Sequence, residues 1–149
     1  MCGINGYIGK YLISPDNIKN SSKILNHRGP DGEGFYSHKF QNTYVNLVHR
    51  RLAIIDIDQR SNQPFSFQNN VLCFNGEIYN YIELKRELET LGHRFKTKGD
   101  TEVLVHALNE WGQNALDKLE GMWAFAWYNE IDGNLFLSRD RFGEKPLYI

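Results

Sequence analysis

The segment GMWAFAWYNEIDGNLFLSRD, residues 121–140, places an Asp-Gly pair between two apolar runs. The runs are Met122–Tyr128 and Leu135–Leu137, and the pair is Asp132-Gly133. Both residues of such a pair tolerate the positive φ angles of a tight hairpin turn. The segment therefore predicts two antiparallel strands that lie side by side.

Three other segments have the apolar and β-branched composition of strands. They are Ile4–Ile8, Thr43–Ile57, and Val71–Phe74, the last of which leads into Asn75-Gly76. These segments are not separated by regularly spaced helical patterns, so they do not predict a doubly wound parallel sheet. An α+β layered fold is expected instead.

Apolar residues spaced three and four positions apart predict two helices. The first contains Tyr81, Leu84, Leu88 and Leu91, with Asn80 as its N-cap and Gly92 at its end. The second runs from about Thr101 to Trp111 and ends at Gly112. A weaker pattern predicts a third helix over Asp16–Asn26.

The composition indicates one globular domain over residues 1–149. Hydrophobic residues make up 41% and charged residues 23%, and the formal net charge is −1. No basic run favours binding to nucleic acid or to an anionic membrane. The uncharged apolar stretch Gly121–Asn129 is too short to span a bilayer, and no signal peptide is evident. Two cysteines do not make a secreted disulfide framework, so a reducing, cytoplasmic location is expected.

Metal-binding and nucleotide-binding motifs are missing from the sequence. The five histidines show no pair at metal-ligand spacing, and neither cysteine lies in a CxxC pair. No P-loop or Rossmann glycine fingerprint occurs. We therefore expect no metal and no cofactor in this domain.

Cys2 follows the start methionine and precedes a glycine. One interpretation is a chance cysteine at a terminus that frays. The other is that removal of Met1 makes Cys2 the first residue, which then carries both a thiol and a free α-amine. An α-amine titrates at about pH 8, so it is a usable base beside its own nucleophile. The second cysteine, Cys73, lies in an apolar run and is expected to pack inertly.

Other polar residues occur near predicted strand and helix ends, and each has a structural alternative. Asn75-Gly76 is alternatively only a hairpin turn. Asp100 is alternatively only an N-cap, which is the usual role of aspartate at such a position. Arg51 is alternatively a surface arginine in a strand, and the adjacent Arg50 must then point the opposite way.

Together with Cys2, these residues are chemically complementary. Attack of a thiolate on a carboxamide needs donors for the developing oxyanion, and the Asn75 side chain and the Gly76 N–H provide them. Arg51 offers a bidentate fork for a substrate carboxylate. Asp100 and Glu77 offer negative charge for a substrate ammonium.

A set of motifs along the chain resembles one known family. The motifs are MCGI, HRGPDGEGFY, HRRLAIIDI with Gln63-Pro64 downstream, FNGEIYN, KGDTEV and GMWAFAWYN…LSRDRFGEKPLYI, in this order. Together they resemble the glutaminase domain of glutamine-dependent asparagine synthetases. These are class II glutamine amidotransferases within the N-terminal nucleophile hydrolases. The resemblance covers nearly the whole chain and implies a four-layer αββα sandwich of two antiparallel sheets.

The resemblance also implies that the domain is truncated at its C-terminal end. Family domains continue past the PLY segment with further strands. Residues 144–149 of this sequence enter an apolar run and stop without a turn or a cap. A strand with no partner leaves unpaired backbone, so the sequence is expected to be part of a longer chain.

The resemblance assigns roles to six residues. Cys2 is the nucleophile, Arg51 binds the glutamine carboxylate, Asn75 and Gly76 form the oxyanion hole, and Glu77 and Asp100 hold the glutamine amine. The loop that contains Arg28 and Asp31 is expected to support the site without touching the substrate.

The implied reaction is hydrolysis of the glutamine side-chain amide through a Cys2 thioester, giving glutamate and ammonia. In the family, ammonia passes through an internal tunnel to an ATP-dependent synthetase domain that converts aspartate to asparagine. That domain, with its ATP and Mg, is expected outside this sequence, and it and glutamine are the expected partners. Two alternatives stay open: the same glutaminase serving another acceptor, such as a sugar carboxylate, and an inactive glutamine-binding module. A homodimer also stays open.

Overall fold

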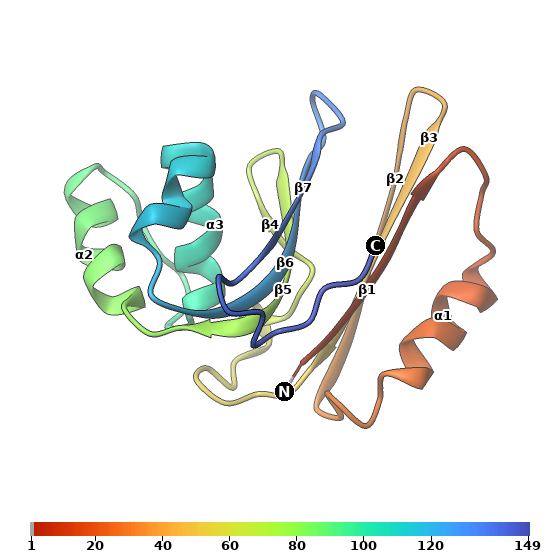
Figure 1. Cartoon of the computed structure of the whole chain (residues 1–149), viewed down its shortest axis with the longest axis horizontal. Coiled ribbons are helices and arrows are strands. Elements are labelled where there is room, and N and C mark those ends of the chain that lie inside the picture. Colours follow the sequence, from red (N-terminus) through yellow and green to blue (C-terminus); the bar gives the residue numbers. More distant parts are fainter. Residues whose placement is uncertain (1) are drawn as a thin grey trace.

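The computed structural model describes residues 2–149, so Met1, whose removal the nucleophile hypothesis requires, lies outside the described residues. Two antiparallel sheets lie between helices (Figure 1). The first sheet has the order β1-β3-β2, with β1 Gly3–Gly9, β2 Gly32–Phe40 and β3 Thr43–Arg51. The second has the order β4-β5-β6-β7, with β4 Phe65–Phe67, β5 Asn70–Ile78, β6 Gly121–Asn129 and β7 Leu135–Arg139. The helices are α1 Pro15–Ile24, α2 Tyr81–Thr90 and α3 Asp100–Trp111, and 3₁₀ segments cover Gln59–Ser61 and Gly112–Lys118.

These elements form four layers. Helix α1 covers the outer face of the first sheet, and α2 and α3 lie over the outer face of the second sheet (Figure 1). The two sheets face each other in the middle of the molecule. The expected αββα sandwich of two antiparallel sheets is therefore confirmed.

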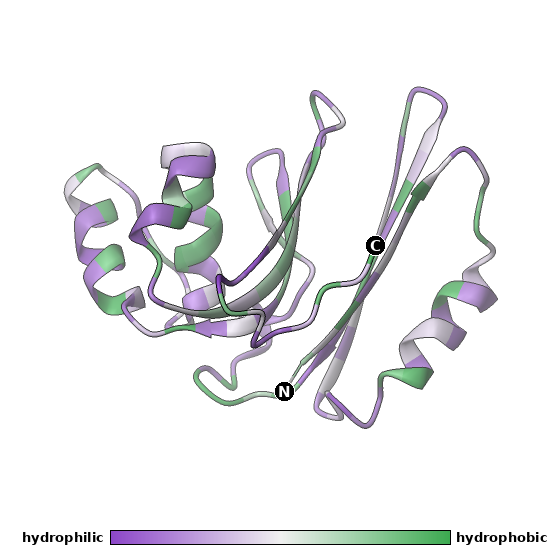
Figure 2. Ribbon diagram, in the orientation of Figure 1, coloured by the Kyte–Doolittle hydropathy of each residue, from purple (hydrophilic) through white to green (hydrophobic). Residues whose placement is uncertain are grey.

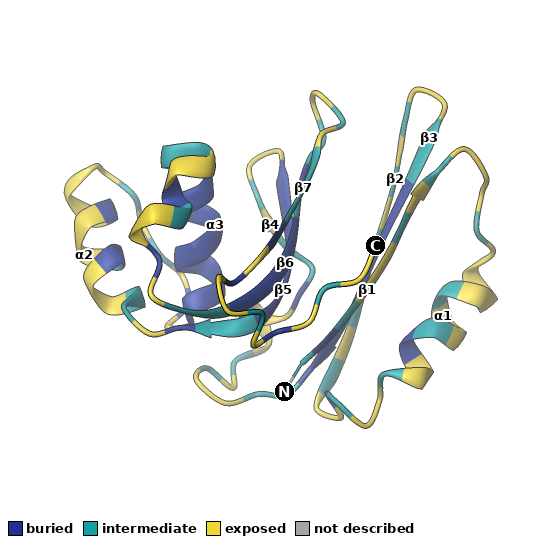
Figure 3. Cartoon of the chain, viewed as in Figure 1, coloured by how far each residue is buried: buried dark blue, intermediate teal, exposed yellow. Residues whose placement is uncertain are grey.

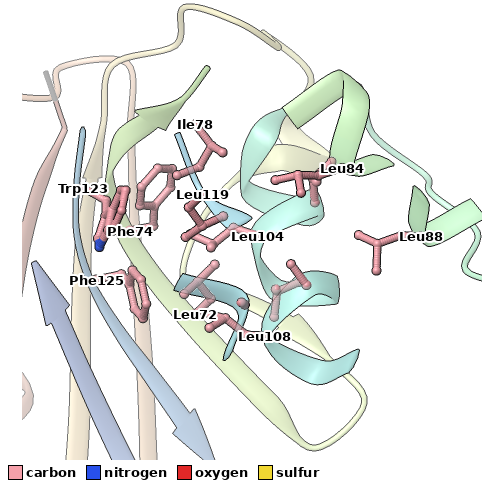
Figure 4. Close-up of a cluster of buried hydrophobic side chains, with 14 residues drawn as sticks. Leu72, Phe74, Ile78, Leu84, Leu88, Leu104, Leu108, Leu119, Trp123 and Phe125 are labelled. Carbon is pink, nitrogen blue, oxygen red and sulfur yellow. The ribbon is translucent and has the colours of Figure 1, made fainter. Parts of the chain in front are cut away.

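Apolar side chains cover both faces of the second sheet. Leu72 and Phe74 of β5 belong to the cluster on the α3 side, and Val71 and Cys73 belong to the cluster between the sheets. This division follows from the alternation of side chains along a strand. Leucines of α3 lie beside Leu72 and Phe74 (Figure 4), and α3 is buried along most of its length (Figure 3). Cys73 is fully enclosed, as its apolar surroundings in the sequence predict.

Helix α2 is the outer of the two helices on this side. Its Leu84 and Leu88 are buried, while its hydrophilic residues alternate with hydrophobic ones along the ribbon (Figure 2). Asn80 is the N-cap of α2, as predicted, but its side chain makes no hydrogen bond within the helix. It instead donates to the carbonyl of Lys118 and accepts from the N–H of Glu120. The amide therefore ties the start of α2 to the segment that leads into β6.

Strand β3 ends at Arg51, although its composition predicted a continuation to residue 57. The next two N–H groups bond to side chains rather than to a neighbouring strand. Leu52 donates to Cys2 Sγ at 3.4 Å, and Ala53 donates to Asp31 Oδ2 at 2.9 Å. The chain leaves the sheet here, and residues 52–64 form a loop at the end of the sandwich.

The hairpin alternative for Asn75-Gly76 is wrong. Both residues lie within β5, where Asn75 is opposite Ala124 and Gly76 is opposite Trp123 of β6. The hairpin predicted between β6 and β7 is present, but its loop spans residues 130–134 and only Gly133 among them has a positive φ. Strands β2 and β4 were not predicted, and residues 144–149 are not in a strand.

Candidate active site

A cavity of about 100 Å³ lies between the 52–64 loop, Cys2 at the start of β1, the end of β5 and the start of α3. All six residues predicted from the sequence line it: Cys2, Arg51, Asn75, Gly76, Glu77 and Asp100. The structure therefore brings together side chains that are separated by up to 98 positions in the chain. Neighbouring residues of the loop and of β6, together with Lys145, complete the wall.

The Cys2 thiol is partly buried against the residue that follows Arg51. Its Sγ accepts from the Leu52 N–H at 3.4 Å and lies 3.8 Å from the Leu52 carbonyl oxygen. Burial raises the pKa of the Cys2 thiol, and the Leu52 N–H and the charge of Arg51 only partly oppose this. The thiol is therefore protonated at neutral pH, and a nucleophilic role requires a base beside it.

Two residues of the 27–32 loop hold the backbone around the thiol. Arg28 Nε donates to the carbonyl of Cys2 at 3.1 Å. Asp31 accepts from Ala53 N–H through Oδ2, and its own N–H donates to the carbonyl of Arg51 at 3.0 Å. This loop thus fixes Cys2 and the end of β3 relative to each other, and neither Arg28 nor Asp31 lines the cavity.

Arg51 is buried, so the surface-arginine alternative is wrong. Its guanidinium donates to the carbonyl of Asp58 at 2.9 Å, to Asn62 Oδ1 at 2.8 Å and to the carbonyl of Asp56. Three of the five guanidinium donors are engaged in this way, which leaves two without an acceptor among residues 2–149. Arg51 can therefore shape the loop and bind an anion at once. Arg50 points the opposite way, as predicted, and bonds to the carbonyl of Gly29.

Strand β5 presents Asn75 and Glu77 on the same face, because residues two apart in a strand point the same way. Asn75 is buried, yet its side-chain amide has no hydrogen-bond partner within the part of the chain that the structure describes. Gly76 has no room for a side chain, since an added Cβ would lie 2.2 Å from the Met122 oxygen and 2.6 Å from a ring carbon of Phe74. The absence of a side chain is thus required where β5 passes β6.

One edge of β5 leaves a single N–H open toward the cavity. Trp123 directs both of its backbone groups to Asp140, so the opposing Gly76 forms a pair without hydrogen bonds and its N–H points away from β6. The N–H groups of Phe74 and Ile78 point to the same edge. Phe74 N–H donates to Gln63 Oε1 at 2.6 Å, and Ile78 N–H donates to Asp100 Oδ2 at 3.0 Å. The N–H of Gly76 lies between these two on the same edge, and Asn75 and Gly76 both line the cavity, so two donors are available to it.

Asp100 is not the N-cap that its position in the sequence suggested. Gly99 is the N-cap of α3, and Asp100 is the first residue of the helix. Burial raises the pKa of the Asp100 carboxyl to about 6, with a further contribution from the nearby charge of Glu77 and an opposing one from the Ile78 N–H. Two carboxylates close together in a cavity form a site suited to an ammonium group.

Some residues of the site were not found by reasoning from the sequence. Gln63, Thr101 and Lys145 line the cavity and are buried. The Gln63-Pro64 pair belonged to a motif that carried the resemblance, but nothing in its pattern indicated a position in the site. Among residues 2–149, no group of three or more His, Cys, Asp or Glu side chains is arranged to hold a metal ion. Within that range, none of the helices has the length and apolarity needed to cross a membrane.

Comparison with known proteins gives consistent matches. The model of a family described as "Glutamine amidotransferase domain" matches residues 1–149. Asparagine synthetase [glutamine-hydrolyzing] 1 of Bacillus subtilis is 41% identical over 99% of this chain, which corresponds to 24% of that protein. Putative asparagine synthetase [glutamine-hydrolyzing] 2 of Methanocaldococcus jannaschii is 39% identical over 99% of this chain and 32% of its own length. The Zea mays asparagine synthetase [glutamine-hydrolyzing] is 39% identical over the whole chain and 25% of its own length.

The fold matches that of a solved structure. Glutamine phosphoribosylpyrophosphate amidotransferase from B. subtilis superimposes with a TM-score of 0.71 over 92% of this chain and 37% of the other, at 24% identity. This match concerns the fold alone. The chain spans about a quarter to a third of the length of the curated relatives it matches.

Proposed function

This chain belongs to the glutamine amidotransferase domain family, and from that premise we propose that it hydrolyses the side-chain amide of glutamine to glutamate and ammonia. The single observation that carries the proposal is the convergence of the open Gly76 N–H and the unpartnered Asn75 amide on the cavity that holds the Cys2 thiol. Two donors beside a thiol are what attack on a carboxamide requires. A module that only binds glutamine has no need of them.

In the first half of the reaction, the Cys2 sulfur attacks the δ-carbon of glutamine. The α-amine of Cys2, free once Met1 is removed, takes the thiol proton and passes it to the leaving nitrogen. The carbonyl oxygen becomes an oxyanion that accepts from Asn75 and Gly76. The C–N bond then breaks, which releases ammonia and leaves a glutamyl thioester on Cys2.

In the second half, water attacks the thioester. The same amine takes a proton from this water, and the same donors hold the second oxyanion. The C–S bond breaks, the sulfur regains its proton and glutamate leaves. One glutamine and one water thus give one glutamate and one ammonia, with no cofactor in this domain.

The relatives support one destination for the ammonia. They are glutamine-hydrolysing asparagine synthetases, and they are three to four times the length of this chain. We propose that the ammonia serves an ATP- and Mg-dependent synthetase domain that amidates aspartate. We also propose a reducing, cytoplasmic location, which the free thiols of Cys2 and Cys73 support.

The test is an assay of the purified protein with L-glutamine, in which glutamate and ammonia are both quantified. We expect equal amounts of the two products without ATP or added metal. Intact mass must show that Met1 is gone, and an electrophilic glutamine analogue is expected to add its mass to Cys2. A folded protein that lacks Met1 and releases no glutamate would contradict the proposal.

Replacing Arg51 is expected to weaken glutamine binding. A charge-assisted bidentate contact contributes about 1.5–3 kcal/mol, so Arg51→Ala should raise KM about 10- to 100-fold. Arg51→Lys should not restore it, because one ammonium cannot reach the three acceptors of the loop and a carboxylate together. Steady-state kinetics over a range of glutamine concentrations measures this effect. An unchanged KM in both variants would remove Arg51 from substrate binding.

Asp100→Asn is expected to stabilise the fold while it weakens catalysis. The carboxyl has a pKa of about 6 in the folded protein and 3.8 when unperturbed, so the folded state binds the proton more tightly. The ionised form therefore destabilises the protein by up to about 3 kcal/mol above pH 6. This destabilisation lessens as the pH falls through 6 toward 4. In denaturant unfolding, the Asp100→Asn variant should have a higher free energy of unfolding than the native protein at pH 7.5. The difference should shrink at low pH.

The same carboxyl sets a pH limit on glutamine use. An ammonium is bound by ionised Asp100, so kcat/KM of the native protein should fall below about pH 6. In Asp100→Asn, kcat/KM should be lower overall and should no longer show this fall at acid pH. An unaltered acid limb in the variant would assign that titration to another group.

A further inference from the structure

Gln63 is a buried side chain that the proposed reaction does not use directly. It is 7% exposed, and both ends of its carboxamide are bonded. Oε1 accepts from the Phe74 N–H at 2.6 Å, and Nε2 donates to Thr101 Oγ1 at 3.3 Å. The orientation of the amide is fixed, because a backbone N–H is only a donor and must face the oxygen. Gln63 thus connects the strand that carries Asn75 to the helix that starts at Asp100.

The register of β4 explains this arrangement. Phe65 is opposite Leu72, so two residues further along the same register Gln63 would be opposite Phe74, and Ser61 would be opposite Gly76. The strand does not continue that far, since β4 begins at Phe65. The Gln63 side chain takes the Phe74 N–H that a longer strand would have taken with its backbone. Beyond Phe74, no strand among residues 2–149 covers this edge of β5, and the Gly76 N–H on that stretch has no backbone partner.

The backbone of Gln63 is also fixed, by a third element. A Cβ on Gly34 of β2 would lie 1.9 Å from the Gln63 carbonyl oxygen, so these two chains are in close contact. The other backbone group of Phe74 is also engaged, since His49 Nε2 lies 3.1 Å from the Phe74 carbonyl oxygen. Both polar backbone groups of Phe74 on this edge are therefore held by side chains, from the loop and from β3.

We infer that Gln63 is a positioning residue for the oxyanion donors. It holds Phe74, the residue before Asn75, at a set distance from α3 and from the first sheet. Asn75 and Gly76 are thereby held in the geometry that stabilises the transition state. Asp100, next to Thr101 at the other end of the bridge, receives the substrate amine. This inference rests on the proposed glutaminase function.

The test compares two buried amides that both join β5 to α3. Gln63→Met keeps the volume and removes the bridge next to the site. Asn70→Leu is the matched control: Asn70 lies at the far end of β5, is 5% exposed, donates to Asn109 of α3 and accepts from Asn129 of β6. Thermal melts and glutamine kinetics are measured for both variants.

Positioning and plain structural support predict different results. We expect Gln63→Met to lower kcat about 10- to 100-fold with KM within about threefold, because a displacement of about 1 Å near reacting atoms has effects of this size. Asn70→Leu should lose comparable thermal stability and keep the native kcat. Equal kcat losses in the two variants, or a native kcat in Gln63→Met, would overturn the inference.

A second variant covers the case in which Gln63→Met does not fold. Thr101→Val removes only the α3 end of the bridge and should lower kcat several-fold, and adding it to Gln63→Met should lower kcat no further. A native kcat in Thr101→Val would overturn the inference. Absence of glutaminase activity in the native protein would instead contradict the proposed function, so the two failures are distinguishable.

Discussion

Cys2→Ala is expected to reduce glutamine hydrolysis by at least about a thousandfold in kcat, to the level of the uncatalysed background. The substitution removes the sulfur that forms the thioester, and no other residue lining the cavity has a thiol. The measurement is glutamate release under saturating glutamine, with intact mass after exposure to an electrophilic glutamine analogue. The variant should not take up the analogue.

Cys73→Ala is the control for this substitution. Cys73 is fully enclosed two residues before Asn75, and burial raises the pKa of its thiol. It bonds to the carbonyl of Val48 and does not line the cavity. The alanine variant should lose some stability and still form the adduct at Cys2. Turnover that survived in Cys2→Ala would show that the nucleophile lies elsewhere.

Asn75→Ala is expected to lower kcat about 100- to 1000-fold, because one oxyanion donor is worth that much in comparable sites. The effect on stability should be small or favourable. Asn75 is 4% exposed and its amide has no hydrogen-bond partner among the described residues, so its removal breaks no hydrogen bond. A loss of activity with an unchanged or raised melting temperature would separate catalysis from folding.

Asn75→Asp provides the matched control for that donor. It keeps the shape of the side chain and replaces the NH₂ group with an oxygen that can only accept when ionised. We expect a loss of kcat at least as large as in the alanine variant. If either substitution left kcat at the native value, Asn75 would have no part in stabilising the oxyanion.

Much of the fold was predictable because it depends on local patterns. The apolar spacing that predicted a helix from Tyr81 matches α2, and the runs around Asp132-Gly133 match β6 and β7. Alternation along β3 also correctly separated Arg50 from Arg51. In each of these cases, the residues that decide the structure are neighbours in the sequence.

The errors occurred where a distant partner decides the structure. Asn75-Gly76 has the pattern of a hairpin turn, but both residues pair with Ala124 and Trp123 of β6 and lie within a strand. Asp100 has the pattern of an N-cap, but its carboxylate turns to the Ile78 N–H, 22 residues earlier. Apolar residues predicted that β3 continues past Arg51, whereas Cys2 and Asp31 take the N–H groups that a further strand would use.

The site was predictable as a set of residue types but not as a geometry. A thiol, two oxyanion donors, a cation and two carboxylates are complementary in their chemistry, and their order along the chain carried the resemblance. The role of Gln63 depends on where β4 begins. Strand β4 is only three residues long and was not predicted from the sequence. The role of such a supporting residue can be recognised only when the pairing register of β4 and β5 is known.

The contact between Cys2 and Leu52 joins residues that are 50 positions apart. During synthesis the N-terminus leaves the ribosome first, so the thiol exists for some time before the segment that encloses it. In that interval nothing buries the sulfur, and its pKa lies below the value it has in the folded domain. A larger fraction is then thiolate, the form that reacts with oxidants and alkylating agents. The nascent chain thus carries its nucleophile exposed, and closure of β1 against β3 is the event that partly buries it.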